Sequence, residues 1–256
     1  MTGASRSALS GLARLAVWLL LWQIAASLSG KEAWRFVPPA PVLRALAHGL
    51  GDGSMLRGVA ASLARVAAAF ALAIALGTAS GVLLTVSSTA AWLAGPLLSG
   101  VQSLPSICWM PLAILWLGLN ERAILFVALM GSVGSIAMAT RDGLASVPLA
   151  YQRVAATFGA TRWQRLALVQ MPAAVPAFVA GLKQGWSFAW RSLLAGELLY
   201  RCTSAGSLLT DARDLADYPR LFAVMALLMA VSVAVDRLVF SPLEADVRRR
   251  WALAPR

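Results

Sequence analysis

The chain has 256 residues, of which 59% are hydrophobic and only 13% are charged, and its mean hydropathy is +0.73. A soluble domain carries about 25% charged residues, so this composition excludes an ordinary soluble enzyme, and its apolar richness excludes a disordered chain. The net charge of +11 does not indicate nucleic-acid binding, because the basic residues lie between long apolar runs rather than in clusters beside aromatic residues. We therefore predict an all-α, multi-pass membrane protein with an excess of Arg on its cytoplasmic side.

Few residues suit catalysis or metal binding. Cys108 and Cys202 are the only cysteines and His48 is the only histidine. Neither a disulfide framework, a zinc site nor a histidine relay is expected from this set. The chain also lacks the G-x-x-x-x-G-K-[ST] motif, so ATP, if used, must be hydrolysed by another chain. We expect no catalytic residue, no metal and no cofactor in this chain.

Six stretches are long and apolar enough to cross a membrane, which takes about 20 residues. They cover residues 9–28, 59–85, 90–118, 122–140, 171–199 and 219–240. The first also fits a signal peptide by its length and the small residues near its end. Six spans place both termini on one side together with residues 141–170, and the run Arg248, Arg249 and Arg250 favours that side as the cytoplasm.

The third stretch contains two prolines with a tryptophan between them. Pro105 and Pro111 prevent an uninterrupted helix and free backbone carbonyls that need protein or water partners. Pro105 and Trp109 are therefore candidates for the wall or gate of a solute pathway. A packing kink explains the same pattern equally well.

The segment between the fourth and fifth spans is predicted to form a helix over residues 147–165, with Ser146 as its cap. On a helical projection, four small residues fall within an arc of about 140°, with one Arg near each edge. The small residues are Ala155, Ala156, Gly159 and Ala160, and the basic residues are Arg153 and Arg162. Such a ridge suits a groove on another protein, and an amphipathic helix lying on lipid headgroups is the alternative.

The fifth span, which Pro172 and Pro176 are expected to break or kink, carries polar residues on one face. Gln184, Ser187 and Arg191 recur at i, i+3 and i+7, and Lys183 lies beside them. Polar residues inside a span usually face protein or water, so this face is predicted to line a pathway for an anion. The alternative is structural, with Arg191 paired to Glu197, Asp236 or a headgroup and Lys183 snorkelling.

Residues of this intervening segment resemble a known loop. Arg153-Val154-Ala155, three residues, Gly159, nine residues and Val169-Gln170-Met171-Pro172 are similar to the EAA loop of permease subunits of binding-protein-dependent ABC importers. Further motifs resemble the sulfonate, taurine and nitrate branch, namely Ser62 to Val66, Pro105 to Gly118, Gly181 to Lys183, Ala195 to Glu197 and Asp211 to Arg213. Arg153 stands where the family usually has Glu, and we hypothesise a compensating acidic or neutral residue on the partner.

The resemblance implies a type I importer permease fold. Residues 1–58 would hold the first membrane helix and a periplasmic loop, residues 59–240 the permease core with the coupling helix 147–165, and residues 241–256 a basic cytoplasmic tail. Arg153, Val154, Ala155, Ala156, Gly159, Ala160 and Arg162 would then contact the ATPase.

The partners implied are two copies of an ABC ATPase that binds ATP and Mg, a second permease copy as a homodimer, and a periplasmic solute-binding protein. The location implied is the bacterial inner membrane, with both termini cytoplasmic. Two other functions are weighed on the residues: an integral membrane enzyme that uses Asp211, Asp214 and Asp217, and a self-sufficient channel or secondary carrier.

Overall fold

The computed structural model describes residues 17–28 and 37–251, and within these ranges the regular structure is helical throughout. A short apolar helix, Val17–Leu28, comes first. The helices that follow are α2 (Pro39–Gly51), α3 (Ser54–Val86), α4 (Ser88–Ser103), the 3₁₀ turn η2 (Ser106–Trp109), α5 (Met110–Leu117), α6 (Glu121–Ala145), α7 (Leu149–Thr157), α8 (Arg162–Arg165), the π-helical turn η3 (Leu166–Gln170), α9 (Met171–Glu197), α10 (Ala205–Asp214), α11 (Tyr218–Val235), the π-helical turn η4 (Asp236–Phe240) and α12 (Ser241–Arg250).

Four of the predicted spans are confirmed as long apolar helices. They are Ser54–Val86, Glu121–Ala145, Arg162–Glu197 and Tyr218–Arg250. The third predicted span is a bent pair, Ser88–Ser103 and Ser106–Leu117, with an angle of 106° between its halves, so the interruption expected from the prolines is confirmed. The first predicted span is described only as Val17–Leu28, since residues 9–16 lie outside the described ranges. The structure thus supports five of the six spans by length and composition.

Three helices, Ser54–Val86, Arg162–Glu197 and Tyr218–Arg250, extend well beyond a bilayer. A helix of 33 residues, such as Tyr218–Arg250, is about 50 Å long, against a hydrocarbon core of about 30 Å. The predicted boundary between core and tail at residue 240 falls inside this helix, because η4 continues α11 into α12 without a loop. The helix around Pro172 and Pro176 is also unbroken, and its irregularity takes the form of the π-helical turn η3 just before Pro172.

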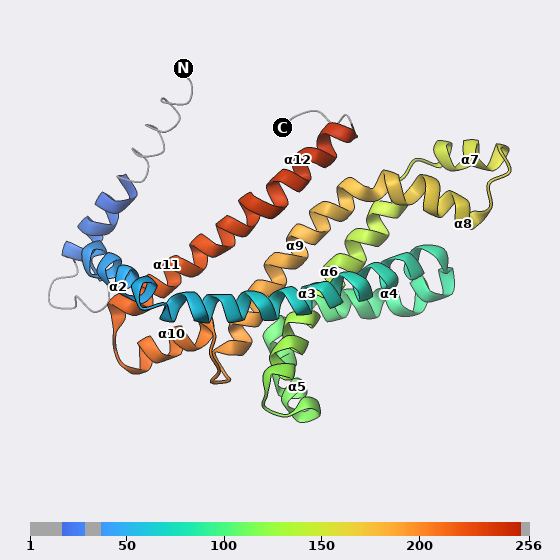
Figure 1. The fold of residues 1–256 in the computed structure, drawn as a ribbon. Helices are drawn as coiled ribbons and strands as arrows, with labels where there is room; N and C mark the ends of the chain where they lie inside the picture. The colour runs from blue at the N-terminus through green and yellow to red at the C-terminus, as the bar shows by residue number, and fades with distance from the viewer. Residues whose placement is uncertain (1–16, 29–36, 252–256) are drawn as a thin grey trace, which may run out of the picture.

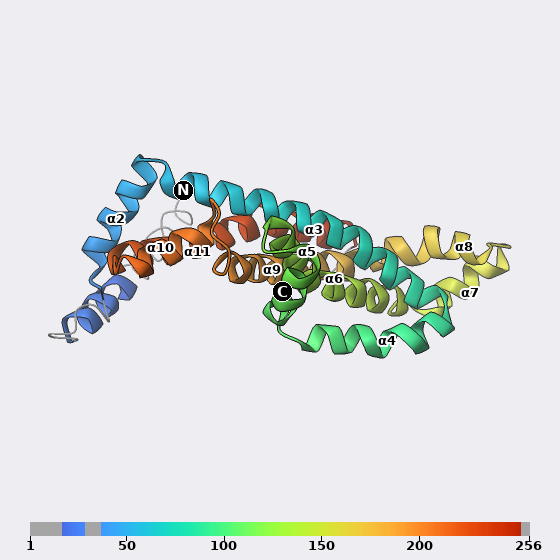
Figure 2. The same cartoon turned by 90° about the horizontal axis from the view of Figure 1, so that it is seen from below.

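The centre of the fold is α6, which packs along both α3 and α9. Small residues bring these helices close together: a Cβ on Gly81 of α3 would lie 2.4 Å from the carbonyl oxygen of Ala137 on α6. In Figures 1 and 2, α7 and α8 form one tip of the molecule, and α2 and α10 lie near the opposite end. The packed helices α3, α6 and α9 connect the two ends.

Candidate functional site

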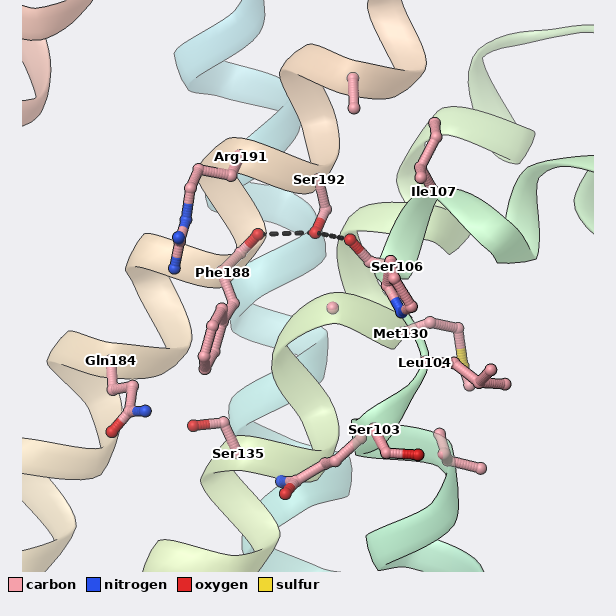
Figure 3. A pocket seen from close by; sticks show the side chains of 15 residues that line it. Ser103, Leu104, Ser106, Ile107, Met130, Ser135, Gln184, Phe188, Arg191 and Ser192 are labelled. Carbon is pink, nitrogen blue, oxygen red and sulfur yellow. Dashed lines mark hydrogen bonds between the residues drawn. The ribbon is translucent and has the colours of Figure 1, made fainter.

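A cavity of about 460 Å³ with several polar residues in its lining lies between η2, α6, α9 and the end of α4. Its polar lining residues come from all four elements (Figure 3): Gln102, Ser103, Ser106, Ser135, Gln184, Arg191 and Ser192. Polar side chains on apolar helices are costly unless they face protein or water. The cavity is therefore the strongest candidate for a solute site among the described residues.

A serine pair joins the two sides of this cavity. The hydroxyl oxygens of Ser192 on α9 and Ser106 on η2 lie 2.6 Å apart, and Ser192 also donates to the carbonyl of Phe188 at 2.6 Å (Figure 3). A Cβ on Gly131 of α6 would lie 2.1 Å from the Ser192 hydroxyl, so glycine leaves the space in which this pair meets. Sequence reasoning missed both serines, because a single Ser in an apolar helix usually bonds its own backbone.

Arg191 is exposed on the cavity side of α9 and has no carboxylate partner among the described residues. Its Nε donates to the carbonyl of Ser187 at 3.1 Å, and its guanidinium lies 5.0 Å from the centre of the Phe188 ring. Pairing of Arg191 with Glu197 or Asp236, the structural alternative, is not what the structure shows, since both acids bond to other residues. A positive charge therefore faces the cavity without an opposite charge from the part of the chain that the structure describes.

The structure brings together only part of the predicted pathway. Pro105, Gln184 and Arg191 line the cavity, while Lys183, Ser187 and Trp109 lie outside its lining. The face of α9 that lines the cavity consists of Gln184, Phe188 and Arg191, a spacing of i, i+4 and i+7. Phe188 takes the place predicted for Ser187. Trp109 packs against the core instead.

Lys183 is neutralised by two acids on the C-terminal helix. Its Nζ lies 2.8 Å from Asp236 and 3.7 Å from Glu244. Lys183, predicted to line the pathway with snorkelling as the alternative, instead forms ion pairs that hold α9 to η4 and α12. Because of this pairing, the Lys183 charge is not available to bind an anionic solute.

The predicted continuous helix over residues 147–165 is wrong. The segment forms α7, which ends at Thr157, then a break, then α8 from Arg162. Gly159 stops α7 because it adopts a left-handed conformation with φ of 75°, which favours glycine. Thr161 then caps α8, with reciprocal bonds between Thr161 and Gln164.

Ser146 is not the cap of this segment. Its hydroxyl donates to the carbonyl of Gly143 at the end of α6, and Pro148 precedes α7 without a side-chain cap. The small-residue ridge is also shorter than predicted, because Ala155 and Ala156 lie on α7 but Gly159 and Ala160 lie in the break. Arg153 is on α7, and Arg162 begins α8, where its guanidinium bonds the carbonyl of Val86 at the end of α3.

No residue of α7 is buried in this chain. Val154 is 56% exposed and Phe158, directly after the helix, is 87% exposed. Apolar side chains exposed beside Arg153 at the tip of the molecule form a surface suited to a protein partner.

A buried charge cluster at the other end of α9 was missed as a site. Glu197 has a side chain that is 0% exposed, and its carboxylate accepts from the Ser62 hydroxyl at 2.7 Å, the Gly206 amide at 3.1 Å and Arg65 at 3.4 Å. The Ala205 amide in turn donates to Ser62 at 2.9 Å, so the first amides of α10 point into the cluster. A signal was available, because Arg65 and Glu197 are charged residues in or next to apolar spans.

Of the acidic residues weighed for an enzyme, Asp211 and Asp214 lie beside arginines, and Asp217 caps the start of α11. Asp214 lies 3.0 Å from Arg201 and 2.9 Å from Arg213, and the bond from Arg213 lowers the pKa of Asp214 below its usual range. A general acid at neutral pH needs a raised pKa instead. Within residues 17–28 and 37–251, no group of three or more His, Cys, Asp and Glu residues is placed to hold a metal ion.

Comparisons with known proteins identify the family and the relatives of this chain. The family model described as "Binding-protein-dependent transport system inner membrane component" matches residues 73–241. The taurine transport system permease protein TauC of Escherichia coli is 26% identical over 91% of this chain and 86% of its own length. The nitrate import permease protein NrtB of Synechocystis is 26% identical over 88% of this chain and 84% of its own length.

A solved structure supports the fold. The chain superposes on the inward-facing MetNI methionine ABC transporter with a TM-score of 0.67 at 18% identity, covering 75% of this chain and 95% of the other. The shared architecture extends over most of both chains.

Proposed function

The chain belongs to the family of binding-protein-dependent transport system inner membrane components, the membrane permease subunits of ABC importers, and from this membership we propose that it conducts a small anionic solute into the cell. The solute class is a sulfonate, taurine or nitrate, delivered by a periplasmic binding protein. The ATPase activity resides in a separate partner chain, which would hold ATP and Mg, and this chain acts as a transporter rather than an enzyme.

The observation that carries the solute class is the charge of Arg191, which lines the cavity and has no carboxylate partner among residues 17–28 and 37–251. A guanidinium with several N–H donors suits the planar or tetrahedral oxygens of nitrate and sulfonate. Gln184 and Ser135 add neutral hydrogen-bonding groups, so one basic residue and several polar ones would hold an anion without trapping it. Taurine and nitrate are also the solutes in the names of two relatives.

The exposed α7 and the break at Gly159 would form the ATPase-coupling surface. We propose that Arg153, Val154, Ala155, Ala156, Gly159 and Ala160 contact the ATPase, while Arg162 fixes the segment to α3. Because α8, η3 and α9 are one helix, a movement of the coupling surface would be transmitted to Gln184 and Arg191.

The assembly proposed is a homodimer of this chain with two ATPase copies and both termini in the cytoplasm. The indole of Trp251, at the end of α12, donates to the carbonyl of Pro172 beside the coupling surface. This contact supports placing the C-terminal end on the same side of the membrane as the ATPase.

The experiment that tests the function is purification of the tagged chain from native membranes, followed by uptake into proteoliposomes supplied with the periplasmic solute-binding protein. A co-purified Walker A protein in equal copies and ATP-dependent uptake of labelled taurine or nitrate are expected. Uptake that persists without ATP, or by the chain alone, would instead identify a channel or secondary carrier.

Replacing Arg191 by Met should lower anion uptake by about tenfold or more, because a hydrogen bond to a charged group contributes about 1.5–3 kcal/mol. Arg191→Lys should retain part of the uptake. Arg201→Met is the matched control, since Arg201 already pairs with Asp214 outside the cavity. Unchanged initial rates and unchanged solute preference in Arg191→Met would remove this residue from the pathway.

Replacing Gly159 by Val should uncouple transport from ATP hydrolysis. A β-branched residue at a φ of 75° is strained by about 1–3 kcal/mol, so the break between α7 and α8 would change shape. The expected result is ATP hydrolysis with fewer solute molecules moved per ATP. Gly159→Asn, which tolerates this conformation better, should retain most coupling. Equal ratios in the two variants would refute this role.

A further inference from the structure

The start of α9 contains a backbone carbonyl that its own helix cannot satisfy. In an α-helix the carbonyl of Pro172 would accept from the amide of residue 176, but residue 176 is proline and has no N–H. The indole Nε1 of Trp251 donates to this carbonyl at 3.0 Å. A side chain 79 positions away thus takes the place of the missing donor.

Trp251 also lies against the coupling surface. It lines a cleft of about 650 Å³ together with Tyr151 and Val154 of α7, Leu168 of η3, and Pro172. Further along the same helix pair, Lys183 holds Asp236 and Glu244. The C-terminal helix is therefore attached to α9 at two places, and the attachment by Trp251 is the one beside α7.

The coupling segment, residues 149–172, is also attached to α3. Arg162 of α8 bonds the carbonyl of Val86, at the end of α3. Trp251 and Arg162 together connect residues 149–172 to α12 and to α3. Of these two residues, only Trp251 donates to a carbonyl that lacks its usual helical donor because of a proline.

We propose that Trp251 is a positioning residue for coupling: its indole holds the junction of η3 and α9 in the orientation through which α7 passes movement of the ATPase to the cavity. This inference rests on the proposed function. In it, Pro176 creates the acceptor and Trp251 fills it, so the C-terminal helix acts as a strut for the coupling segment. The bond reaches the junction from outside the α3, α6 and α9 core, so its loss need not unfold that core.

A double-mutant cycle tests the pairing. Trp251→Phe keeps an aromatic ring and removes the donor, while Pro176→Ala returns a backbone N–H to the Pro172 carbonyl. Losing one hydrogen bond corresponds to about 1 kcal/mol, or about a fivefold change in population. Trp251→Phe should therefore speed hydrogen exchange of residues 166–171 about fivefold and lower solute uptake per ATP. In the Pro176→Ala background the same change should have little further effect.

The measurements use the whole importer complex purified from native membranes and supplied with its periplasmic solute-binding protein, with labelled taurine and nitrate as probes. Trp18→Phe is the control, because Trp18 is 72% exposed on the helix Val17–Leu28, outside the coupling segment. A structural role alone would lower the yield of the complex and leave the uptake per ATP of the surviving complex unchanged.

The outcomes separate this inference from the function on which it rests. A wild-type complex that hydrolyses ATP but moves neither probe contradicts the proposed function. Hydrogen exchange would still show whether Trp251 bonds the Pro172 carbonyl. A wild-type complex that transports, with an unchanged ratio in Trp251→Phe, overturns the inference alone. An equal loss in both backgrounds would show that Trp251 acts through a group other than the Pro172 carbonyl, which also overturns it.

Discussion

Replacing Glu197 by Ala is expected to destabilise the subunit by about 3–5 kcal/mol, the usual cost of removing one partner from a buried ion pair. The variant leaves the hydroxyl of Ser62 and the amide of Gly206 without their acceptor and leaves Arg65 with Glu121 as its remaining carboxylate. Because the cluster joins α3, α9 and α10, these helices should separate at that end first. Unfolding in detergent, followed by tryptophan fluorescence against added SDS, measures the change.

Two variants make the Glu197 measurement specific. Glu121→Ala removes the other partner of Arg65, but the Glu121 side chain is 56% exposed and such pairs contribute about 0–1 kcal/mol. Glu197→Gln keeps the size and part of the hydrogen bonding and should fall between the two. A Glu197→Ala protein no less stable than Glu121→Ala would show that burial of this carboxylate is not compensated by the contacts described.

The second large effect is expected at the contact between α3 and α6. A Cβ at Gly81 would lie 2.4 Å from the Ala137 carbonyl oxygen and 2.6 Å from Cβ of Thr140. The first of these atoms is backbone, so no change of rotamer relieves the clash and the helices must move apart. Overpacking of this kind destabilises a protein by about 1–3 kcal/mol or more. Gly81→Leu should lower the stability more than Gly81→Ala does.

Gly100→Ala on α4 is the matched control for Gly81. Nothing lies within 4 Å of a Cβ built at Gly100, and replacing a helical glycine by alanine in open space stabilises by about 0.5–1 kcal/mol. The two Gly→Ala changes should therefore have opposite signs in the same SDS titration. If Gly81→Ala were as stable as the wild type, α3 and α6 would be less closely packed than the structure shows.

Hydropathy and proline positions predicted most of the fold, and local chemistry explains where they failed. Long apolar runs identified four complete helices and the bent pair, because a bilayer requires them. The predicted helix over residues 147–165 is wrong because helical periodicity continues through Gly159 and the Thr161 to Gln164 capping pattern, although the left-handed glycine and the new cap end one helix and begin another. A glycine shortly before a Thr-x-x-Gln capping box indicates that one helix ends and another begins.

Part of the candidate site depended on tertiary contacts that no spacing rule contains. The face of α9 was found, since Gln184 and Arg191 both line the cavity. Lys183 could not be separated from them by helical position, because its neutralisation depends on Asp236 and Glu244, more than 50 positions away. The Ser106 and Ser192 pair likewise required α9 and η2 to be placed side by side.

The continuity of the helix Arg162–Glu197 has a consequence for timing. Arg165 and Arg191 are 26 positions apart, or about 39 Å along one helix axis. No loop interrupts this helix between the cavity and η3, but Pro176 removes one of its backbone hydrogen bonds there. With the junction held by Trp251, displacement of the coupling surface should be accompanied by displacement of the cavity face, so the transport cycle should contain few species in which only one of the two has shifted.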